Sequence, residues 1–564
     1  MAEGHSGRLE LTWTNKQLRL LSHEDGSYEW LPPADYRVAE ARLLRDAGTT
    51  GEVHSDRQRA KDNLLIRGDS LNALTSLTRI PEFRDEYVGK VQLVYIDPPF
   101  NTQQAFEQYD DALEHSVWLT MMRDRLQLLK KMLADDGSIW VHCDDSEQGY
   151  LRVLMDEVFG RQSFVATVVW EKRYSRSNDA SLSVSHDYIL VYAKDSVHWA
   201  KTRNLLARTA EQGKQYSNPD NDPKGPWRAV PFDAPNIRAN LSYPITTPAG
   251  TVRHPPKGRH WSTTEDKWLK IVESGLAYFG KKGDGAPAVK RYLEDDQGIV
   301  PNTWWEHEDT GHTDEANKEI RALIPDVAAF ATPKPERLMA RIIQIATNPG
   351  DIVLDCFAGS GTTAAVAHKM RRRWVTGEWS RETLETFTGP RLEKVVSGDD
   401  VGGISGSVEW TGGGGFRVLD VAPSMFEAFE GQVLLAEWAV GSALSEAVAA
   451  QFGYEYDSEL LPFAGRKGRV RLAVVDGLVN EAVARLLVAE LPEDERLCLC
   501  GTMVDQDVRE VLRELRPGST VRKVPETILA DYRQGQFWWD RHAGAVESNG
   551  DEPAEPAAAE QVQA

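Results

Sequence analysis

The sequence predicts an α/β fold in which a doubly wound, mostly parallel sheet is interrupted by an inserted domain. Short apolar runs alternate with amphipathic helices over residues 63–193, and the same alternation returns over 325–395. Strands that alternate with helices form mostly parallel sheets covered by helices on both faces. Between about 194 and 300 this order gives way to sequence rich in proline, glycine, aromatic and basic residues, so we expect a different domain there.

The periodicity of each run predicts the elements of the sheet. The helix expected around 115–135 places Met122, Leu126, Leu129 and Leu133 on one face. The other elements expected in the first half are the strands VQLVYI (91–96), SIWVHC (138–143), FVATVVW (164–170) and DYILVYA (187–193) and a helix around 146–158. In the second half they are a helix through Glu336–Ala346, the strand DIVLDCF (351–357), the helix TTAAVAHKM (362–370) and the strand WVTGE (374–378).

The rest of the chain divides by composition. Glycine dominates SGDDVGGISGSVEWTGGGG at 397–415, which indicates a linker or loop. Beyond it, the apolar runs RVRLAVVDG and LCLCG and helices at 479–490 and 505–516 predict a small second α/β unit. The expected boundaries are an N-terminal extension 1–60, the first half of the sheet 61–193, the insert 194–300, the second half 301–396, the linker 397–415, the C-terminal unit 416–543 and a disordered tail 544–564.

Composition restricts the class of protein. With 564 residues, 41% apolar and 27% charged, the chain is typical of a soluble protein of about two to four domains. It has no run of about 18–20 apolar residues and no hydrophobic signal core, so we expect a cytoplasmic protein that does not span a membrane. The four cysteines are too scattered for a disulfide framework or a zinc site, and buried, reduced thiols are expected at Cys143, Cys356, Cys498 and Cys500.

Charge is distributed unevenly. The net charge is −21, but residues 191–300 carry 17 Lys and Arg against 12 Asp and Glu, whereas residues 401–564 carry 14 against 27. A basic middle segment in an acidic protein indicates that nucleic acid binds there.

A glycine corner follows the strand that ends at Asp355. In VLDCFAGSGTT (353–363), Gly359 and Gly361 allow a ligand close to the backbone, and the next helix begins with free N–H groups. Glu378, at the end of the following apolar run, could accept hydrogen bonds from two ribose hydroxyls. The corner lacks the G-x-G-x-x-G spacing and the lysine of phosphate loops, which favours an adenosine ligand such as S-adenosylmethionine. The alternative is a tight turn without a ligand.

The strand VQLVYI ends on Asp97, Pro98, Pro99 and Phe100. The prolines end the strand and stiffen the corner. The Asp97 carboxylate and the Pro98 carbonyl are then two acceptors that can hold one exocyclic amino group, and Phe100 offers a face for base stacking. Such a base must leave the duplex first. The alternative is that these residues only end the strand and cap a helix.

Together these motifs resemble a known family. IDPPFNT (96–102) with FATPKPERLMARIIQIATNPGDIVLDCFAGSGTT (330–363) resembles the amino-methylating DNA methyltransferases, and more narrowly the modification subunits of type III restriction systems. The resemblance covers about 61–420 and implies a seven-stranded sheet in the circularly permuted β-class order, with the insert as target-recognition domain. Asp at the first catalytic position resembles the adenine-N6 enzymes, whereas cytosine-N4 enzymes usually carry Ser.

The resemblance also implies roles for individual residues. Asp97 and Pro98 would hold the adenine amino group, with Pro99 and Phe100 completing the catalytic motif. Lys334 would meet the cofactor carboxylate, Glu378 the ribose, and Asp69 lies in a family motif near the active site. The other residues expected around S-adenosylmethionine are Phe330, Thr332, Pro335, Asp355, Phe357, Ala358, Gly359, Ser360, Gly361 and Thr362.

Basic and aromatic side chains interleave in the insert, where they could neutralise phosphates and contact bases. The candidates for DNA binding are Trp227, Arg228, Arg253, Lys257, Arg259, Trp261, Lys290 and Arg291. The alternative is a small structural domain with tryptophans in its core. No metal is expected: Asp144, Asp145 and Glu147 indicate the N-terminus of a helix, and His142, His186 and His312 lack metal-ligand spacing.

The expected activity is site-specific methylation of adenine N6 in duplex DNA by base flipping and direct attack, in a restriction-modification or phage-defence system. Two alternatives stay open: a DNA-recognition subunit that mainly loads a helicase–nuclease partner, and a cytosine-N4 methyltransferase. The family implies a homodimer. The recognised sequence cannot be read from these residues.

Overall fold

The computed structural model divides the chain into two units, Met1–Arg203 with Thr303–Ala564, and Asn204–Asn302. It describes residues 10–22, 27–99, 105–106, 109–110, 114–176, 181–208, 213–295, 298–325, 327 and 330–543. The tail 544–564 and Phe100 therefore lie outside the described residues. The inserted unit begins later than the expected 194 because helix α6 (Ser196–Thr202) packs on strand β8 of the larger unit.

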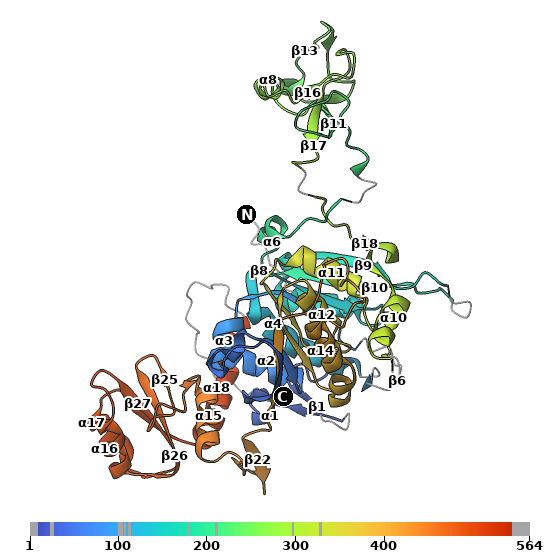
Figure 1. Ribbon diagram of the computed structural model, residues 1–564. Helices are drawn as coiled ribbons and strands as arrows, with labels where there is room; N and C mark the ends of the chain where they lie inside the picture. Colours follow the sequence, from blue (N-terminus) through green and yellow to red (C-terminus); the bar gives the residue numbers. More distant parts are fainter. Residues whose placement is uncertain are drawn as a thin grey trace, which may run out of the picture. The chain divides into compact units, whose positions relative to one another are not determined.

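The larger unit is built on a ten-stranded sheet, described here within the residues given above (Figure 1). Its strands, in spatial order, are β18 (Trp304–Trp305), β9 (Phe164–Glu171), β10 (His186–Ala193), β8 (Leu133–Cys143), β5 (Val91–Ile96), β19 (Ile352–Asp355), β20 (Arg373–Glu378), β4 (Asn63–Arg67), β21 (Gly415–Val421) and β3 (Leu44–Gly51). From β8 to β21 neighbouring strands are parallel, whereas β10 is antiparallel to both of its neighbours.

Six of these strands were expected from the sequence, namely β9, β10, β8, β5, β19 and β20, whereas β4, β18, β21 and β3 were not, so the described sheet has ten strands where the resemblance implies seven. β21 corrects the expected boundary of the C-terminal unit, because residues from 415 onward pair with β4 and β3 in the main sheet. β3 comes from the N-terminal extension, whose polar sequence shows no clear strand period.

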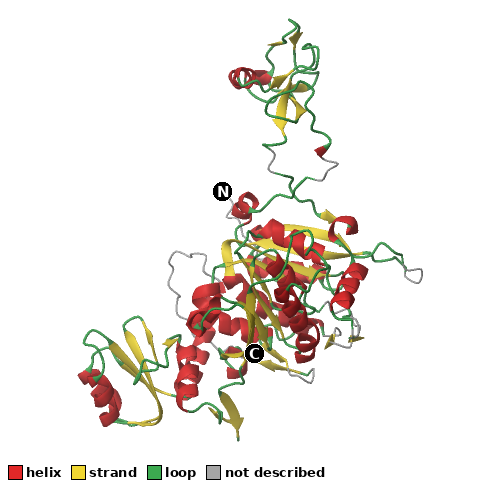
Figure 2. Ribbon diagram, in the orientation of Figure 1, coloured by secondary structure: helices red, strands yellow, loops and turns green. Residues whose placement is uncertain are grey.

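Helices cover both faces of this sheet (Figure 2). Ile352 and Leu354 point into the core shared with α2, α4 and α5, and the alternation of a strand turns Val353 to the opposite face, where α12 packs. The helices that contribute to this core are α2 (Ser70–Arg79), α3 (Pro81–Tyr87), α4 (His115–Met132) and α5 (Gln148–Phe159). The helices that follow the insert and precede β21 are α9 (His307–Thr310), α10 (Thr313–Leu323), α11 (Glu336–Ala346), α12 (Thr362–Lys369), α13 (Arg381–Thr383) and α14 (Gly389–Ser397).

The N-terminal residues add small elements: strands β1 (Arg19–Ser22) and β2 (Tyr28–Leu31), which pair, and helix α1 (Tyr36–Ala39). The paired strands β6 (Ala105–Phe106) and β7 (Tyr109–Asp110) lie between β5 and α4 in the chain.

Three tryptophans hold the points where the chain leaves and re-enters the larger unit. Trp140 of β8 lies 6.4 Å from Trp199 of α6 and 6.0 Å from Trp305 of β18, measured between ring centroids. α6 precedes the insert and β18 follows it, so both crossings pack against one side chain.

A buried charge network joins α11, α12, α14 and the glycine-rich stretch. Lys369 Nζ lies 2.8 and 2.9 Å from the two carboxylate oxygens of Glu336 and 2.7 Å from Asp400 Oδ2. Arg391 Nη2 lies 2.8 Å from Glu336 Oε1, and the Ile404 N–H donates to Glu336 Oε2 at 2.9 Å. The stretch 397–415, expected to be a linker or loop, is therefore an ordered loop that packs against the sheet's helices.

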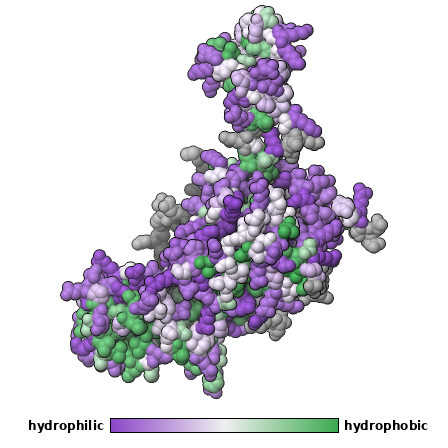
Figure 3. Space-filling view, in the orientation of Figure 1, coloured by the Kyte–Doolittle hydropathy of each residue, from purple (hydrophilic) through white to green (hydrophobic). Residues whose placement is uncertain are grey.

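The C-terminal residues form a five-stranded sheet in the order β24-β25-β26-β27-β28, with Cys498 and Cys500 buried on β27. Figure 3 shows apolar residues gathered on the surface of this part of the chain. Its exposed apolar side chains include Leu478, Leu486 and Met503. The elements are β22 (Phe426–Phe429), β23 (Gln432–Leu435), α15 (Gly441–Phe452), β24 (Glu455–Tyr456), β25 (Gly465–Lys467), β26 (Val470–Val479), α16 (Glu481–Ala489), β27 (Arg496–Val504), α17 (Val508–Leu515), β28 (Thr520–Lys523) and α18 (Glu526–Ala543). Of the helices in the described residues, none has the length and apolar character needed to cross a bilayer.

The inserted unit has its own small core of Phe232, Ile245, Trp261, Trp268 and Phe279. Its elements are β11 (Trp227–Pro231), β12 (Asp233–Pro235), β13 (Ile245–Thr246), β14 (Val252–Arg253), β15 (Arg259–Trp261), α8 (Glu265–Glu273), β16 (Ala277–Tyr278) and β17 (Ala288–Tyr292).

The buried network predicts a large effect of removing its lysine. Lys369→Met leaves Glu336 and Asp400 without their shared cation, so the free energy of unfolding should fall by about 3–5 kcal/mol. Arg381→Ala breaks an exposed pair with Glu385 and serves as the control, with an effect of less than about 0.5 kcal/mol. Thermal and urea unfolding of both variants measure the difference. Equal midpoints for the two variants would contradict the prediction.

Candidate functional site

A cavity of about 720 Å³ lies at the carboxyl edge of the ten-stranded sheet. Its lining comes from both halves of the larger unit, as expected for an open α/β sheet. Asp97 follows β5, in the middle of this edge. The residues after β19, β20 and β4 lie on one side of Asp97, which we call the glycine side. The residues at the ends of β8, β9 and β10 lie on the other side, which we call the hairpin side because β9 and β10 are consecutive antiparallel strands.

Asp97 is held by a partner from the other half of the chain. Lys334 Nζ lies 2.5 Å from Asp97 Oδ2, while Asp97 Oδ1 is buried and has no hydrogen-bond partner among the described residues. Pro98 and Pro99 also line the cavity, and the Pro99 carbonyl accepts a hydrogen bond from Trp118 Nε1 at 2.6 Å. The corner is thus fixed at both ends and presents one unpaired carboxylate oxygen.

The glycine corner forms the turn between β19 and α12. Gly359 has φ +50° and a Cβ there would lie 3.3 Å from Phe330 Cζ, while Gly361 has φ +76° and its Cβ would lie 3.1 Å from Thr388 Cγ2. The Thr388 hydroxyl donates to the Gly359 carbonyl at 2.7 Å. Side chains other than glycine would therefore strain this turn. Of the expected residues within this turn, Phe357, Ala358, Gly359, Ser360 and Thr362 line the cavity, whereas Gly361 is the N-cap of α12.

Two carboxyl groups are buried beneath the turn. Burial raises the pKa of Asp355 to about 8, although the Phe357 N–H donates to its Oδ1 at 3.0 Å. Burial likewise raises the pKa of Glu378 to about 7. The Glu378 oxygens accept hydrogen bonds from the N–H groups of Gly359 at 2.9 Å and Ser380 at 3.0 Å. Glu378 thus supports the turn, and each of its oxygens retains acceptor capacity for a ligand.

The segment 330–335 lies against the same turn. Phe330, Thr332 and Lys334 line the cavity, whereas Pro335 is the N-cap of α11. The Phe330 ring also packs edge-on against Phe387, with centroids 5.2 Å apart.

Asp69 holds a buried arginine that the sequence analysis did not single out. Asp69 Oδ1 caps α2 through the N–H groups of Leu71 and Asn72, and its Oδ2 accepts from Arg125 Nη2 at 2.7 Å. Arg125 is 4% exposed, lines the cavity, and lies 6.0 Å from the Phe357 ring centroid. The sequence signal that could have identified Arg125 is its position on the buried face of a long amphipathic helix, α4.

Trp379 was also missed. It directly follows Glu378, lines the glycine side, and is 45% exposed. An aromatic residue next to the acid at the end of a strand could have indicated it. The N-terminal extension contributes Leu20, Ser22, Ser27 and Tyr28 to the cavity, and nothing in its sequence indicates this.

The hairpin side contains a buried hydrogen-bonded chain. Tyr95 OH lies 3.0 Å from His142 Nδ1, His142 Nε2 lies 3.4 Å from Asp187 Oδ2, and Lys172 Nζ lies 2.5 Å from Asp187 Oδ1. Burial alone would raise the pKa of Asp187, but His142 and Lys172 lower it to about 2. His142, for which no function was expected, is fully buried and connects Tyr95 and Asp187, two residues that line the cavity.

The acidic residues after β8 differ in position. Asp144 and Asp145 line the cavity, and Asp144 Oδ1 accepts the Ser146 N–H at 2.9 Å. Glu147 precedes α5 and pairs with His115 at 2.8 Å without capping the helix through its side chain. These acidic residues therefore precede helix α5 in the chain, as expected, but the Glu147 side chain does not cap it.

In the inserted unit the candidates for DNA binding separate by burial. Trp227 and Trp261 are 3% and 2% exposed, and Lys290 is 8% exposed with its Nζ 2.5 and 2.6 Å from Asp220 and Asp222. All three are therefore buried, and Trp261 belongs to the apolar core of the unit. Arg253 donates to the Asp284 carbonyl and Arg259 pairs with Asp233, both partly exposed. The remaining candidates reach solvent at least in part: Arg228, Lys257 and Arg291.

Comparisons with known proteins agree with this geometry. A family model described as DNA methylase (N6_N4_Mtase) matches residues 91–388. The Mod subunit of the type III restriction-modification enzyme StyLTI from Salmonella typhimurium is 35% identical over 334 residues, which are 54% of this chain and 49% of that protein. The probable HindVI Mod subunit from Haemophilus influenzae is 31% identical over 456 residues, 69% of this chain and 57% of that protein.

A third relative carries a different kind of name. The type II methyltransferase M.EcaI from Enterobacter cloacae is 34% identical over 295 residues, 51% of this chain and 61% of that protein. The chain therefore spans about half to three fifths of the length of these curated relatives.

The raised pKa of Asp355 predicts a pH dependence of stability. Because this carboxyl stays protonated in the folded protein up to pH about 8 but ionises near pH 4 when unfolded, stability should fall as the pH rises between these values. Asp355→Asn removes this contribution. From pH 6 to pH 8 the wild-type protein should lose about 2 kcal/mol more than the variant, measured by urea unfolding. The exposed Asp135→Asn is the control; parallel pH curves for wild type and Asp355→Asn would contradict the prediction.

Proposed function

Because the chain belongs to the DNA methylase family whose model spans residues 91–388, we propose that it transfers a methyl group from S-adenosylmethionine to the N6 amino group of adenine in duplex DNA. One observation carries the proposal. Asp97 is held by Lys334 through one oxygen, and its other oxygen is buried and unpaired in the cavity that contains the glycine turn.

The residues of the glycine side fit S-adenosylmethionine. At Gly359 the backbone can approach a ligand closely, and a Cβ there would meet Phe330. Glu378 would accept from the ribose, the exposed ring of Trp379 would stack on the adenine, and Lys334 would reach the carboxylate. When bound, S-adenosylmethionine supplies an electrophilic methyl group.

Asp97 would act on the target base. Its Oδ1 and the Pro98 carbonyl would accept the two hydrogens of the amino group, which turns the nitrogen lone pair toward the glycine side. The N–C bond forms as the methyl–sulfur bond breaks, and the nitrogen then loses a proton, for which Asp97 Oδ1 is the nearby acceptor. Lys334 would hold the Asp97 carboxylate in position throughout the transfer.

The base must leave the duplex first, because the amino group of a paired adenine is engaged there. We propose that it enters the cavity from the hairpin side. The cavity extends to Asp144, Lys172 and Asp187 on that side, beyond the glycine turn. We assign the contacts with phosphates to the solvent-reaching insert residues Arg228, Arg253, Lys257, Arg259 and Arg291.

Chain order supports a finer assignment. Asp97 precedes Gly359 with the insert between them, which supports the circularly permuted β-class order that we propose for the seven strands from β9 to β4. Two relatives are named Mod subunits, and we propose that this chain likewise works as a homodimer in a restriction-modification or phage-defence system beside a helicase–nuclease partner.

Expression in a methylation-deficient host tests the activity. Nucleoside mass spectrometry should find N6-methyladenine, and methylation-sensitive single-molecule sequencing should place it in one sequence motif. Asp97→Ala should lower transfer about 10²- to 10³-fold, because the amino group loses its acceptor, while S-adenosylmethionine binding persists. Asp135→Ala, a distant exposed carboxylate, is the control. N4-methylcytosine would instead establish the second candidate activity, and unmodified DNA would refute both.

Trp379 offers a separate test of the cofactor assignment. Trp379→Ala should weaken S-adenosylmethionine binding about 5- to 100-fold, the range expected for loss of one base–aromatic stack. Isothermal titration calorimetry measures this binding without DNA. The exposed Trp304→Ala, on the edge strand β18, should leave it unchanged. Unaltered binding by Trp379→Ala would exclude Trp379 as the adenine contact.

A further inference from the structure

Strands β9 and β10 continue past the edge of the sheet as a hairpin, described over residues 172–176 and 181–185. The N–H groups of Lys172 and Arg173 donate to the Ser185 carbonyl at 2.9 and 3.2 Å, which keeps the two arms together at their root. Lys172, Arg173 and Val184 line the cavity. The root of the hairpin is therefore part of the cavity rim, on the side away from the glycine turn.

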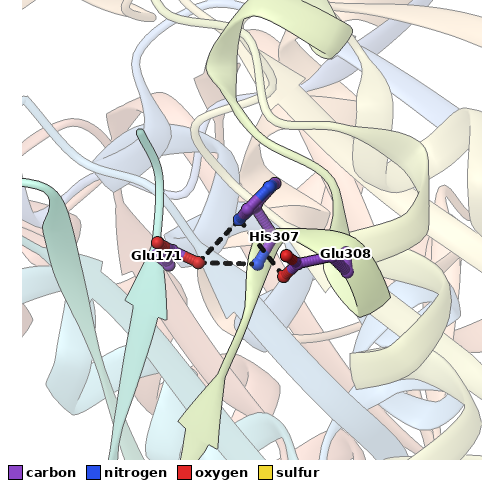
Figure 4. Close-up of side chains that lie close together, drawn as sticks. All are labelled: Glu171, His307 and Glu308. Carbon is purple, nitrogen blue, oxygen red and sulfur yellow. Dashed lines mark hydrogen bonds and ion pairs between the residues drawn. The ribbon is translucent and has the colours of Figure 1, made fainter. Parts of the chain in front are cut away.

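Tyr174 at this root is exposed to solvent and yet held in place. Its side chain is 63% exposed, and its ring stacks on His307 with centroids 5.3 Å apart and an interplanar angle of 27°. Figure 4 shows how His307 is held: Glu171 Oε2 lies 2.7 Å from His307 Nδ1 and accepts the His307 backbone N–H at 3.2 Å. The edge of His312 contacts the same tyrosine ring at 5.4 Å.

The same group of side chains could suggest a metal site, because Glu171, His307 and Glu308 bring a ring nitrogen and two carboxylate oxygens within 4.8 Å. The ring nitrogen is already engaged as a donor between two carboxylates, with Glu308 Oε2 at 3.3 Å. Its hydrogen bond to Glu171 raises the pKa of His307, and a metal ligand must be deprotonated. The cluster is better explained as an ion pair that supports Tyr174.

The surroundings of Tyr174 suit a nucleic acid. Among the described hairpin residues, Arg173 and Arg176 are basic and exposed, whereas Lys172 is paired with Asp187. Leu182 and Val184 on the opposite arm are 86% and 52% exposed. Basic groups attract phosphates, while apolar and aromatic side chains contact unstacked bases.

We infer that the hairpin root is the surface that receives the DNA duplex beside the cavity, and that Tyr174 stacks on the bases next to the position vacated by the extruded nucleotide. This rests on the proposed function, which requires extrusion. Opening the stack is unfavourable, and it is least unfavourable for a base that is already unpaired. A ring held in place beforehand can replace part of the lost stacking without losing further freedom on binding.

The test compares two substrates and a matched control. Duplexes carry the motif that the wild-type protein methylates, with the target adenine either paired with thymine or opposite an abasic site. Tyr174→Ala should lower kcat/KM about 10- to 100-fold on the paired duplex and less than about threefold opposite the abasic site. Tyr174→Phe keeps the ring and should stay within about twofold of wild type. Phe429→Ala removes a ring that is 62% exposed on β22 and should have no effect.

His307 is a positioning residue here, and a double-mutant cycle tests it. His307→Gln should lower kcat/KM on the paired duplex, and adding it to Tyr174→Ala should cause little further loss, since the support has no ring left to hold. Additive losses would overturn its role.

Three results separate the inference from the proposed function. Tyr174→Ala that behaves as Phe429→Ala, or that loses the same factor on both duplexes, would overturn the inference while methylation by the wild-type protein stands. Absence of transfer by the wild-type protein would refute the proposed function, and the inference with it.

Discussion

The parallel pairing of β5 with β19 is the constraint on which the cavity depends. Val94 stands opposite Leu354 in this pair, and both strands run in the same direction. Asp97 and Asp355 therefore leave the sheet at one edge, although the whole insert lies between them in the chain. A slip of one residue would turn Leu354 out of the core and move both acids, so the packing of the core and the geometry of the site are maintained by the same register.

Around this edge the protein buries charge that would be costly without partners. Lys334 compensates Asp97 and Arg125 compensates Asp69, in each case across two segments that are distant in sequence. Asp355 and Glu378 have backbone donors instead, and burial raises the pKa of both. Pairs of this kind contribute little net stability, but they specify where each oxygen and each nitrogen points. The cavity is therefore organised before any ligand arrives.

The two corners of the site and the kind of sheet were predictable from the sequence, because at these places one residue type meets one backbone requirement. Prolines that end a strand and glycines at positive φ mark the two corners, and the alternation of strands and helices indicates the sheet. Arg125, Trp379 and Tyr174 were missed because their roles arise from neighbours brought together only by folding. Trp227, Trp261 and Lys290 were ambiguous for the opposite reason: basic and aromatic residues have the same pattern in a small core as on a DNA-binding surface. β21 followed a glycine-rich stretch that seemed to end the domain.

Trp140 carries a consequence for how such proteins diversify. The helix before the insert and the strand after it both pack on this one side chain through Trp199 and Trp305. Because the insert joins the larger unit at two neighbouring points, it is comparable to an insertion in a surface loop. The strand order of the ten-stranded sheet therefore does not depend on the fold of the insert. Under the proposed function, exchange of the segment between Arg203 and Thr303 would change the DNA sequence that is recognised and leave the sheet and its cavity unaltered.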